Sequence, residues 1–410
     1  MMSKPCAANK PVLIVGAGPV GLSLACLLAD AGIASRVLEA KPLATLAAPA
    51  EDGREIALTQ RSIALLQRLG AWQDLTPEET SPLRRARVFN GRQAASLLFE
   101  AGEAALGTLV PNDALRRIAH AGALRRSALI TLHGEASVTA LALDGMAATV
   151  SLADGQRLQG PLLVAADSRF STLRRLAGIP CELLDFGRSV QLARIEHQRP
   201  HQDQALECFH HGHTMAWLPL GGRSPCLSSL VLTLPADLAE TLRGWEDSRW
   251  LDWVQTHAQD RLGVLRLAGP RHQYPLVASY ARHFAAQRFA LVGDAAVGMH
   301  PVTAHGYNFG LYGAERLAEA LRREGVAEPA AALARYAEGH RRETRLIYQG
   351  TNALVRLFTA EAMPARLLRR GVLDIAQRLP PLKQLITARL TERAGLTGSQ
   401  ALKKPRSRSL

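Results

Sequence analysis

A glycine-rich turn between an apolar strand and an apolar helix constrains the fold of this chain more than any other feature. Residues 11–15 form a buried-strand run, and Gly16, Gly18 and Gly21 follow at the spacing G-x-G-x-x-G before an apolar helix over 22–31. The first glycine permits a tight turn, the second lets the backbone approach a pyrophosphate, and the third lets the helix pack on the strand. We therefore predict a dinucleotide-binding β-turn-α unit whose helix N-terminus binds phosphates.

The second predicted strand closes this unit with an acidic residue. Residues 35–39 are predicted to form a strand that ends in Glu39, roughly 20 residues past the glycines, as in dinucleotide-binding βαβ units. A carboxylate at this place accepts hydrogen bonds from the ribose hydroxyls of FAD or NAD and repels a 2′-phosphate. Spacing and context thus favour nucleotide binding over a glycine turn that serves the fold alone.

Length and composition bound the class of protein. At 410 residues the chain exceeds the size at which a single core stops growing, so we expect two domains. Its five cysteines are scattered without a C-x-x-C pair, which argues against a disulfide framework and a zinc site. The His-rich run at 210–213 lacks an H-E-x-x-H pattern, so we expect no metal.

The net charge and hydropathy of the chain bear on its binding partners and its cellular location. The formal net charge of +13 attracts nucleic acid, anionic lipid and phosphorylated ligands alike. Aromatic residues make up only 5% of the chain, too few for base stacking along the basic C-terminal region, so no nucleic-acid partner is expected. We find no run of about 18 apolar residues without charged or turn residues, and no apolar signal segment at the N-terminus. The expected location is the cytoplasm.

The order of predicted elements divides the chain. Another strand-turn pattern at 288–294 precedes a helix over 306–323, whereas residues 181–275 lack the βαβ order and contain short pieces typical of an antiparallel sheet. The predicted parts are a discontinuous nucleotide-binding domain (1–80, 101–180 and 276–345), a substrate domain (81–100 and 181–275) and a C-terminal helical segment with a basic tail (346–410).

A motif far downstream of the glycine turn favours FAD over NAD as the bound nucleotide. It runs Leu291-Val-Gly-Asp-Ala-Ala296, then His300-Pro301, then Ala304-His-Gly-Tyr-Asn-Phe-Gly310. This stretch resembles the GD motif of the class A FAD-dependent monooxygenases, most of all in the branch that hydroxylates ubiquinone precursors, the UbiH, UbiF and UbiM type, with UbiM the most similar. The resemblance implies that Asp294 bonds the ribityl chain of FAD. It also implies that the helix starting near Gly306 and Asn308 aims its positive end at the flavin.

Two further segments resemble the same family. Val164-Ala-Ala-Asp-Ser-Arg-Phe-Ser171, followed by Thr172-Leu-Arg174, is similar to its DG motif, in which an aspartate and an arginine, here Asp167 and Arg174, serve FAD and pyridine-nucleotide binding. Ala165 and Ser168 replace the two usual glycines of that motif. Arg54 falls in a segment whose arginine lies near FAD in the family, and a solvated surface arginine is the alternative.

The resemblance implies a fold and an activity. The fold class is α/β: a doubly wound, Rossmann-like FAD-binding domain of the aromatic hydroxylase type, an inserted, mostly antiparallel β substrate domain, and C-terminal helices. The activity is hydroxylation of the aromatic ring of a polyprenyl phenol or quinone precursor in ubiquinone biosynthesis. It runs through a flavin C4a-hydroperoxide, with FAD as cofactor, NAD(P)H as co-substrate and O2 as oxidant. His305 is the candidate for a catalytic proton or hydrogen-bonding role, with a packed histidine as the alternative.

Partners and rival functions stay open. A lipid-like substrate and the basic, leucine-rich segment over 354–370 favour peripheral contact with the inner face of the membrane, or contact with ubiquinone-biosynthesis proteins; an ordinary packing helix is the alternative. Within the fold, the rivals are a hydroxylase of a small soluble aromatic and an FAD-dependent isoprenoid reductase. The rival from a different class is a non-catalytic, basic flavin- or RNA-binding protein.

Overall fold

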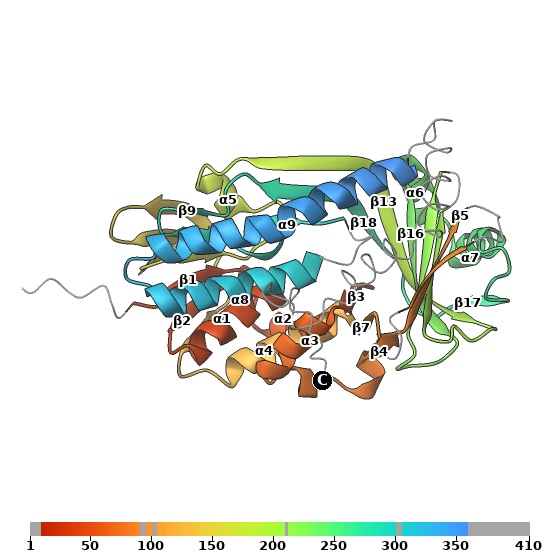
Figure 1. Ribbon diagram of the computed structural model, residues 1–410, viewed down its shortest axis with the longest axis horizontal. Helices are drawn as coiled ribbons and strands as arrows, with labels where there is room; N and C mark the ends of the chain where they lie inside the picture. Colours follow the sequence, from red (N-terminus) through yellow and green to blue (C-terminus); the bar gives the residue numbers. More distant parts are fainter. Residues whose placement is uncertain (1–9, 91–95, 101–104, 210–211, 301–305, 360–410) are drawn as a thin grey trace, which may run out of the picture.

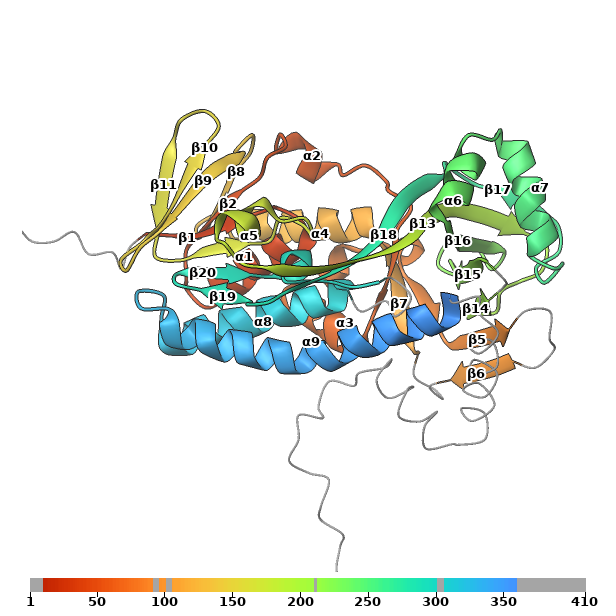
Figure 2. The same ribbon diagram turned by 90° about the horizontal axis from the view of Figure 1, so that it is seen from above.

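The computed structural model describes residues 10–90, 96–100, 105–209, 212–300 and 306–359 of the chain. Figure 1 shows a parallel sheet covered by helices at one end of the molecule and a large, mostly antiparallel sheet at the other. A long helix runs from the first part along to the second (Figure 2).

The parallel sheet is built from short segments, and its central strands are apolar and buried on both faces, as strands covered by helices must be. Its strands are β1 (Val12–Val15), β2 (Ser35–Leu38), β8 (Ile130–His133), β12 (Leu163–Ala165), β19 (Ala285–Ala286) and β20 (Phe289–Leu291). Their order is β19-β20-β12-β1-β2-β8, and all but β19 run parallel. The chain first extends the sheet on one side of β1 and later on the other, so a topological switch point lies between β1 and β12.

Helices pack against this sheet and against one another. They are α1 (Pro19–Asp30), α2 (Ala44–Ala47), α3 (Gln60–Arg68), α4 (Asn112–Leu124), α5 (Thr172–Leu176), α8 (Gly306–Glu324) and α9 (Ala330–Thr359). α1 contacts both α4 and α8, and α8 contacts α9. The hydroxyl of Tyr336 on α9 donates a hydrogen bond to the carbonyl of Leu291, which ties this helix to the end of β20.

Among the described residues, two small sheets and three short 3-10 helices complete the helix-covered part. One antiparallel sheet contains β9 (Val138–Leu143), β10 (Ala148–Leu152) and β11 (Arg157–Gly160), and the other has the order β3 (Glu55–Leu58), β7 (Gly107–Pro111), β4 (Ser81–Leu83). The 3-10 helices are η2 (Trp72–Asp74), η3 (Pro77–Glu79) and η4 (Gly293–Ala295). In Figure 1, β3, β7 and β4 lie between the helices and the large sheet.

The large sheet contains longer strands in which leucine is frequent. Its strands are β5 (Arg85–Asn90), β6 (Ser96–Glu100), β13 (Cys181–His197), β14 (Gln204–Phe209), β15 (Thr214–Pro219), β16 (Leu227–Pro235), β17 (Leu265–Leu267), β18 (His272–Ala281) and β21 (Val297–Gly298). The main order is β21-β18-β13-β16-β15-β14-β5-β6, with β17 paired to β13. β5 and β14 pair in parallel, and the other pairs are antiparallel.

The two faces of the large sheet have different neighbours. Two helices, α6 (Ala236–Arg243) and α7 (Asp247–His257), cover the face we call outer, where the indole N–H of Trp250 donates to Gln191 at 2.8 Å. Arg194, three residues further along β13, points to the opposite face and forms an ion pair with Glu55 of β3 at 3.0 Å. Because side chains alternate along a strand, this second face, called inner, is turned toward the helix-covered part.

The predicted α/β fold with an inserted, mostly antiparallel sheet is confirmed. The helix predicted over 22–31 begins earlier, at Pro19, because proline at the first helical position already has a helical φ. The helix predicted over 306–323 runs from Gly306 to Glu324. The division into domains stays a prediction, and of the predicted C-terminal segment 346–410 only the part up to Thr359, on α9, lies within the described residues.

Candidate functional site

The carboxyl ends of the parallel strands bring the predicted glycine turn and acids to one edge of the sheet. Gly16 follows β1 directly, Glu39 follows β2, Asp167 lies two residues after β12, and Asp294 lies three residues after β20. β12, β1 and β2 are neighbours, and β20 is next to β12. In open α/β sheets, ligands bind in the crevice at this edge, beside the switch point.

The three glycines of the turn have different roles. Gly16 has a φ of +108°, and a Cβ there would lie closer than 3.0 Å to the carbonyl of Ala166. A Cβ on Gly21 would meet the carbonyl of Gly16 at a similarly short distance. Gly18 differs, because a Cβ at this N-cap of α1 would have nothing within 4 Å. Gly16 and Gly21 are therefore required by packing, whereas Gly18 keeps open the space in front of the helix N-terminus.

Glu39 links the end of β2 to this turn. Its Oε2 accepts a hydrogen bond from the backbone N–H of Ala17 at 2.9 Å, and its Oε1 accepts one from the N–H of Lys41 at 3.1 Å. The half-buried carboxylate is thus held beside the glycine turn. Each oxygen can accept a second hydrogen bond, so vicinal hydroxyls of a ribose can bind here.

Asp167 has an unused acceptor at the switch point. Its Oδ2 accepts the N–H of Thr172 at 3.0 Å, but its Oδ1 is buried and has no hydrogen-bond partner among the described residues. The Asp167 Cα lies 3.0 Å from where a Cβ on Gly16 would be. A buried carboxylate oxygen without a donor is costly, so this position favours a ligand that brings a hydroxyl or N–H.

Two arginines join the segment after β12 to the segment after β20. Arg169 donates from Nη2 to Asp294 Oδ2 at 2.9 Å and from Nη1 to the carbonyl of Val277 at 2.8 Å. Arg174, which is 3% exposed, donates to the carbonyls of Ala295 and Arg169, both at 3.0 Å. Sequence reasoning quoted Arg169 within its motif but assigned it no role, because a partner 125 residues away has no local signal.

Arg54 lies beside strand β18 of the large sheet. It forms a hydrogen-bonded ion pair with Asp52, with Nε to Oδ2 at 3.0 Å, and lies over the ring of Tyr274 at 5.5 Å. Tyr274 donates its hydroxyl proton to the carbonyl of Asp52 at 2.8 Å. Burial alone would raise the pKa of Asp52, but the hydrogen bond and charge of Arg54 hold it below its ordinary value. The pair is therefore charged at neutral pH.

The start of α8 faces the same region. Gly306 is the first residue of the helix, and Asn308 is 1% exposed. The Asn308 amide donates to the carbonyl of Ala57 at 2.9 Å, and its oxygen accepts from the N–H of Thr59 at 3.1 Å and the hydroxyl of Ser62 at 2.6 Å. These bonds tie α8 to β3 and α3. A contact of Asn308 with a cofactor stays a prediction, and His305 lies outside the described residues.

His300 is buried between aromatic and positive groups. Its ring meets that of Phe186 edge to face with centroids 4.9 Å apart. Burial, and then the charges of Arg169 and Arg188, lower the pKa of His300 to about 4. The imidazole is therefore neutral at physiological pH.

The inner face of the large sheet carries an apolar row with one acid, a feature that sequence reasoning missed. Cross-strand pairing places these residues next to one another in the order Leu97, Val88, Glu207, Ala216, Val231 and Leu192. Burial raises the pKa of Glu207 to about 8. The only local signal was an acid within the strand Gln204–Phe209, whose alternate side chains belong to the outer-face core.

Two histidines of the large sheet and its surroundings, His197 and His213, have structural partners. His197 hydrogen-bonds Ser228 at 2.9 Å, and His213 packs against Trp253. Within the described ranges we find no group of three or more His, Cys, Asp or Glu side chains placed to hold a metal. In the same ranges, no helix combines the length and hydropathy needed to cross a bilayer.

Comparison with known proteins identifies the family and the fold to which this chain is similar. Residues 9–348 match the model of the FAD binding domain family. A solved structure of p-nitrophenol 4-monooxygenase from Pseudomonas putida superposes with a TM-score of 0.75 and 18% identity, over 93% of this chain and 98% of that one, which shows the shared fold.

Curated relatives define the branch. Ubiquinone hydroxylase UbiM of Neisseria meningitidis is 41% identical over 396 residues, 93% of this chain and 85% of that protein. Ubiquinone hydroxylase UbiL of Rhodospirillum rubrum is 38% identical over 91% of this chain and 87% of that protein. The chain belongs to the FAD-dependent monooxygenases of the FAD binding domain family, in the ubiquinone hydroxylase branch.

The residues at the sheet edge fit FAD. The open space at Gly18 is where a pyrophosphate would meet the N-terminus of α1, and Glu39 accepts hydrogen bonds of the kind that ribose hydroxyls donate. The unpaired Oδ1 of Asp167 and the exposed part of the Asp294 carboxylate provide further acceptors along the crevice. FAD is thus the cofactor that both the family and the donor and acceptor pattern support.

Proposed function

We propose that this chain is an FAD-dependent monooxygenase that hydroxylates the aromatic ring of a polyprenyl phenol or quinone precursor in ubiquinone biosynthesis. The observation that carries the proposal is the 41% and 38% identity to two ubiquinone hydroxylases over more than nine-tenths of the chain. The matched region also covers more than four-fifths of each relative.

The residues at the carboxyl edge of the parallel sheet hold the cofactor in this proposal. Bound FAD, reduced by NAD(P)H, supplies the activation of O2 and the oxygen transfer. Arg54 offers a fixed positive charge beside the inner face of the large sheet, and α8 directs its N-terminus to the same region. The proposed cofactor-binding residues are Gly16, Gly18, Gly21, Glu39, Arg54, Asp167, Asp294, Gly306 and Asn308.

The apolar row on the inner face supports a lipid-like substrate. Leu192, Val231 and Ala216 form a continuous apolar surface across three strands, next to the strand that carries Glu207. A polyprenyl chain needs such a surface, because each CH2 removed from water contributes about 0.8 kcal/mol. With its pKa near 8, Glu207 is protonated at neutral pH and can donate a hydrogen bond to a phenol or quinone oxygen.

The lipid-like substrate bears on the location and the partners of the enzyme. A cytoplasmic enzyme that reaches a lipid-like substrate needs peripheral contact with the inner face of the membrane or with ubiquinone-biosynthesis proteins. The net charge of +13 supports attraction to an anionic surface. The basic tail from 403 onward that would make this contact lies outside the described residues.

The test is complementation of a bacterium that lacks its own ubiquinone flavin hydroxylases. Expression of this chain is expected to restore ubiquinone, and mass spectrometry of the accumulated intermediates would show which ring positions are hydroxylated. The matched control is Asp294→Ala, which removes an acceptor at the cofactor site and is expected to leave the intermediates unchanged.

Other outcomes separate the rival functions. Unchanged intermediates with a soluble, FAD-loaded protein would contradict the proposal and favour a small soluble aromatic substrate. NAD(P)H oxidation without O2 uptake, accompanied by saturation of isoprenoid double bonds, would indicate a reductase. Salt-dependent RNA binding without NAD(P)H oxidation would indicate a non-catalytic binding protein.

A further inference from the structure

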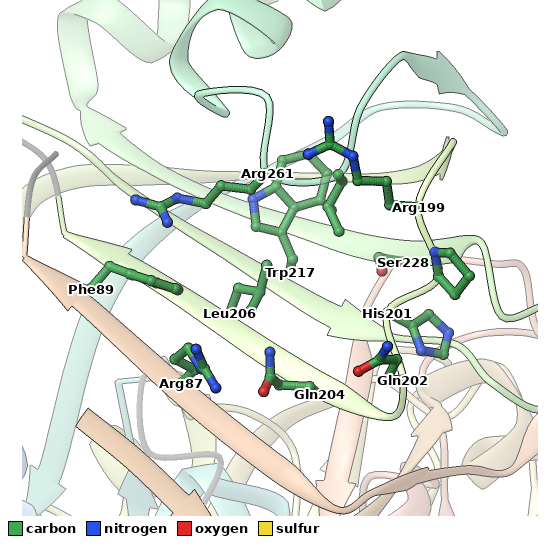
Figure 3. A pocket seen from close by; sticks show the side chains of 12 residues that line it. Arg87, Phe89, Arg199, His201, Gln202, Gln204, Leu206, Trp217, Ser228 and Arg261 are labelled. Carbon is green, nitrogen blue, oxygen red and sulfur yellow. The ribbon is translucent and has the colours of Figure 1, made fainter. Parts of the chain in front are cut away.

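A cavity of about 510 Å³ opens on the outer face of the large sheet, away from the cofactor crevice (Figure 3). Its floor comes from Phe89 on β5, Leu206 on β14 and Trp217 on β15, which belong to the apolar core that also packs under α7. The turn after α7 contributes Arg261 and Leu262. Because these side chains alternate with those of the inner face, the sheet itself separates the cavity from the proposed hydroxylation site.

Two guanidinium groups line this cavity with donors that the described residues do not use. Arg261 lies 3.8 Å from the centroid of the Phe89 ring and donates from Nη2 to Gln259, but its buried Nε has no partner. Arg87 has a buried Nε without a partner and forms no hydrogen bond or ion pair within the described ranges. In Figure 3, Arg87 and Arg261 lie on either side of Phe89.

Two further basic groups of the cavity, Arg199 and His201, are already engaged. Arg199 donates to the carbonyl and the carboxylate of Asp260, the latter at 3.0 Å. His201 accepts the N–H of Asp203 at Nδ1 and contacts the carbonyl of Ser224 through Nε2 at 3.1 Å. Burial lowers the pKa of His201, so this ring is neutral. The uncompensated positive charge in the cavity therefore comes from Arg87 and Arg261.

The lining specifies the chemistry of an occupant. Buried N–H groups without acceptors are costly, and a carboxylate matches the fork of a guanidinium. The rings of Phe89 and Trp217 and the side chain of Leu206 favour a flat apolar body attached to that anion. The volume falls in the range of about 300–1,000 Å³ that small-molecule sites occupy.

We propose that this cavity is a second ligand site that binds a small aromatic carboxylate, with Arg87 as the principal anion contact. The site stands apart from the hydroxylation chemistry, and its existence does not depend on the substrate proposed above. A simple inorganic anion would make no contact with the apolar floor, and a neutral aromatic compound would leave the charges of Arg87 and Arg261 without a counter-ion.

The test is calorimetric titration of the FAD-loaded enzyme with 2-naphthoate and with the neutral analogue 2-naphthamide. The wild-type enzyme is expected to bind one naphthoate, and Arg87→Gln is expected to weaken binding about 10-fold or more, because a hydrogen bond to a charged group is lost. Arg261→Met, which keeps an apolar stem over Phe89, should also weaken it. Arg243→Gln, at an exposed arginine on α6 paired with Glu240, is the matched control and should bind as the wild type does.

Several results would overturn the proposal. Equal binding of naphthamide, or naphthoate binding that neither the Arg87 nor the Arg261 variant changes, would show that the two guanidiniums do not form the site. A change in the flavin absorption spectrum on titration would place the ligand in the cofactor crevice. Sedimentation with phosphatidylglycerol vesicles that depends on Arg87, without naphthoate binding, would assign the cavity to a lipid headgroup. The melting temperature and FAD content of each variant show whether it is folded. If one of the two arginine variants fails to fold, naphthoate binding by the other provides the test.

Discussion

The contrast between Gly18 and Gly21 allows cofactor binding to be separated from folding by two alanine substitutions. In Gly18→Ala, the new methyl group meets nothing within 4 Å and the backbone keeps its φ of −67°. Loss of a glycine N-cap costs about 0.5–1 kcal/mol, and the smaller freedom of the unfolded chain offsets about 0.4–1 kcal/mol. The stability of the apoprotein should therefore change by less than about 1 kcal/mol, or a few degrees in Tm.

The same methyl group should weaken FAD binding. It enters the space in front of the α1 N-terminus, where the pyrophosphate would approach the backbone. Displacing the phosphate from one backbone N–H removes a hydrogen bond to a charged group, worth about 1.5–3 kcal/mol, so affinity should fall about 10- to 100-fold. In Gly21→Ala, by contrast, the Cβ lies closer than 3.0 Å to the Gly16 carbonyl, and overpacking should cost the apoprotein about 1–3 kcal/mol.

Two measurements test this reasoning. Thermal unfolding of the three apoproteins should place Gly18→Ala near the wild type and Gly21→Ala well below it. Titration of the apoproteins with FAD, followed by flavin fluorescence, should show the weakened affinity of Gly18→Ala. Unchanged FAD affinity in Gly18→Ala, or a loss of Tm equal to that of Gly21→Ala, would refute the assignment of Gly18 to the phosphate site.

Three further predictions concern the acids and the amide of the site. Asp294→Ala should lower Tm only slightly, since its partly exposed pair with Arg169 is worth about 1 kcal/mol or less, yet it should lose FAD during gel filtration; full FAD retention would contradict its role. Asn308→Ala removes three hydrogen bonds that join α8 to β3 and α3, so the free energy of unfolding, measured in urea, should fall by about 2–4 kcal/mol. A smaller loss would argue against a stabilising role for these hydrogen bonds. The pKa of Glu207 is raised from 4.5 to about 8. Between these two pH values the folded state keeps a proton that the unfolded state loses. The stabilisation due to the neutral acid is therefore complete below pH 4.5 and is lost as the pH rises through 8. Glu207→Gln, with a permanently neutral side chain, should therefore show a flatter dependence of Tm on pH than the wild type, and identical profiles would contradict the burial of this acid.

The unit around the cofactor crevice was predictable because its signals are local. A strand, a glycine turn and a helix within about 30 residues specify a nucleotide-binding unit by steric requirements alone. Glu39 was predicted because it closes a predicted strand at the spacing of a dinucleotide-binding unit. Asp167 and Asp294 were predicted because they stand in motifs that resemble those of the family, two and three residues after apolar strands. Parallel strands bring their carboxyl ends to one edge, so local sequence and a general rule of topology placed all three acids together.

Pairing between distant segments decided the rest. Arg169 reaches Asp294 over 125 residues and Asn308 reaches Ala57 over 251, and nothing in the sequence indicates either pairing. The apolar row around Glu207 needs five strand pairings whose register decides which side chains share a face, and a shift of one residue would place this acid on the outer face. Local patterns, together with motifs that resemble a known family, indicated the cofactor and the class of fold, whereas the surroundings of Glu207 and the cavity at Arg87 exist only through strand register, which the tertiary structure alone decides.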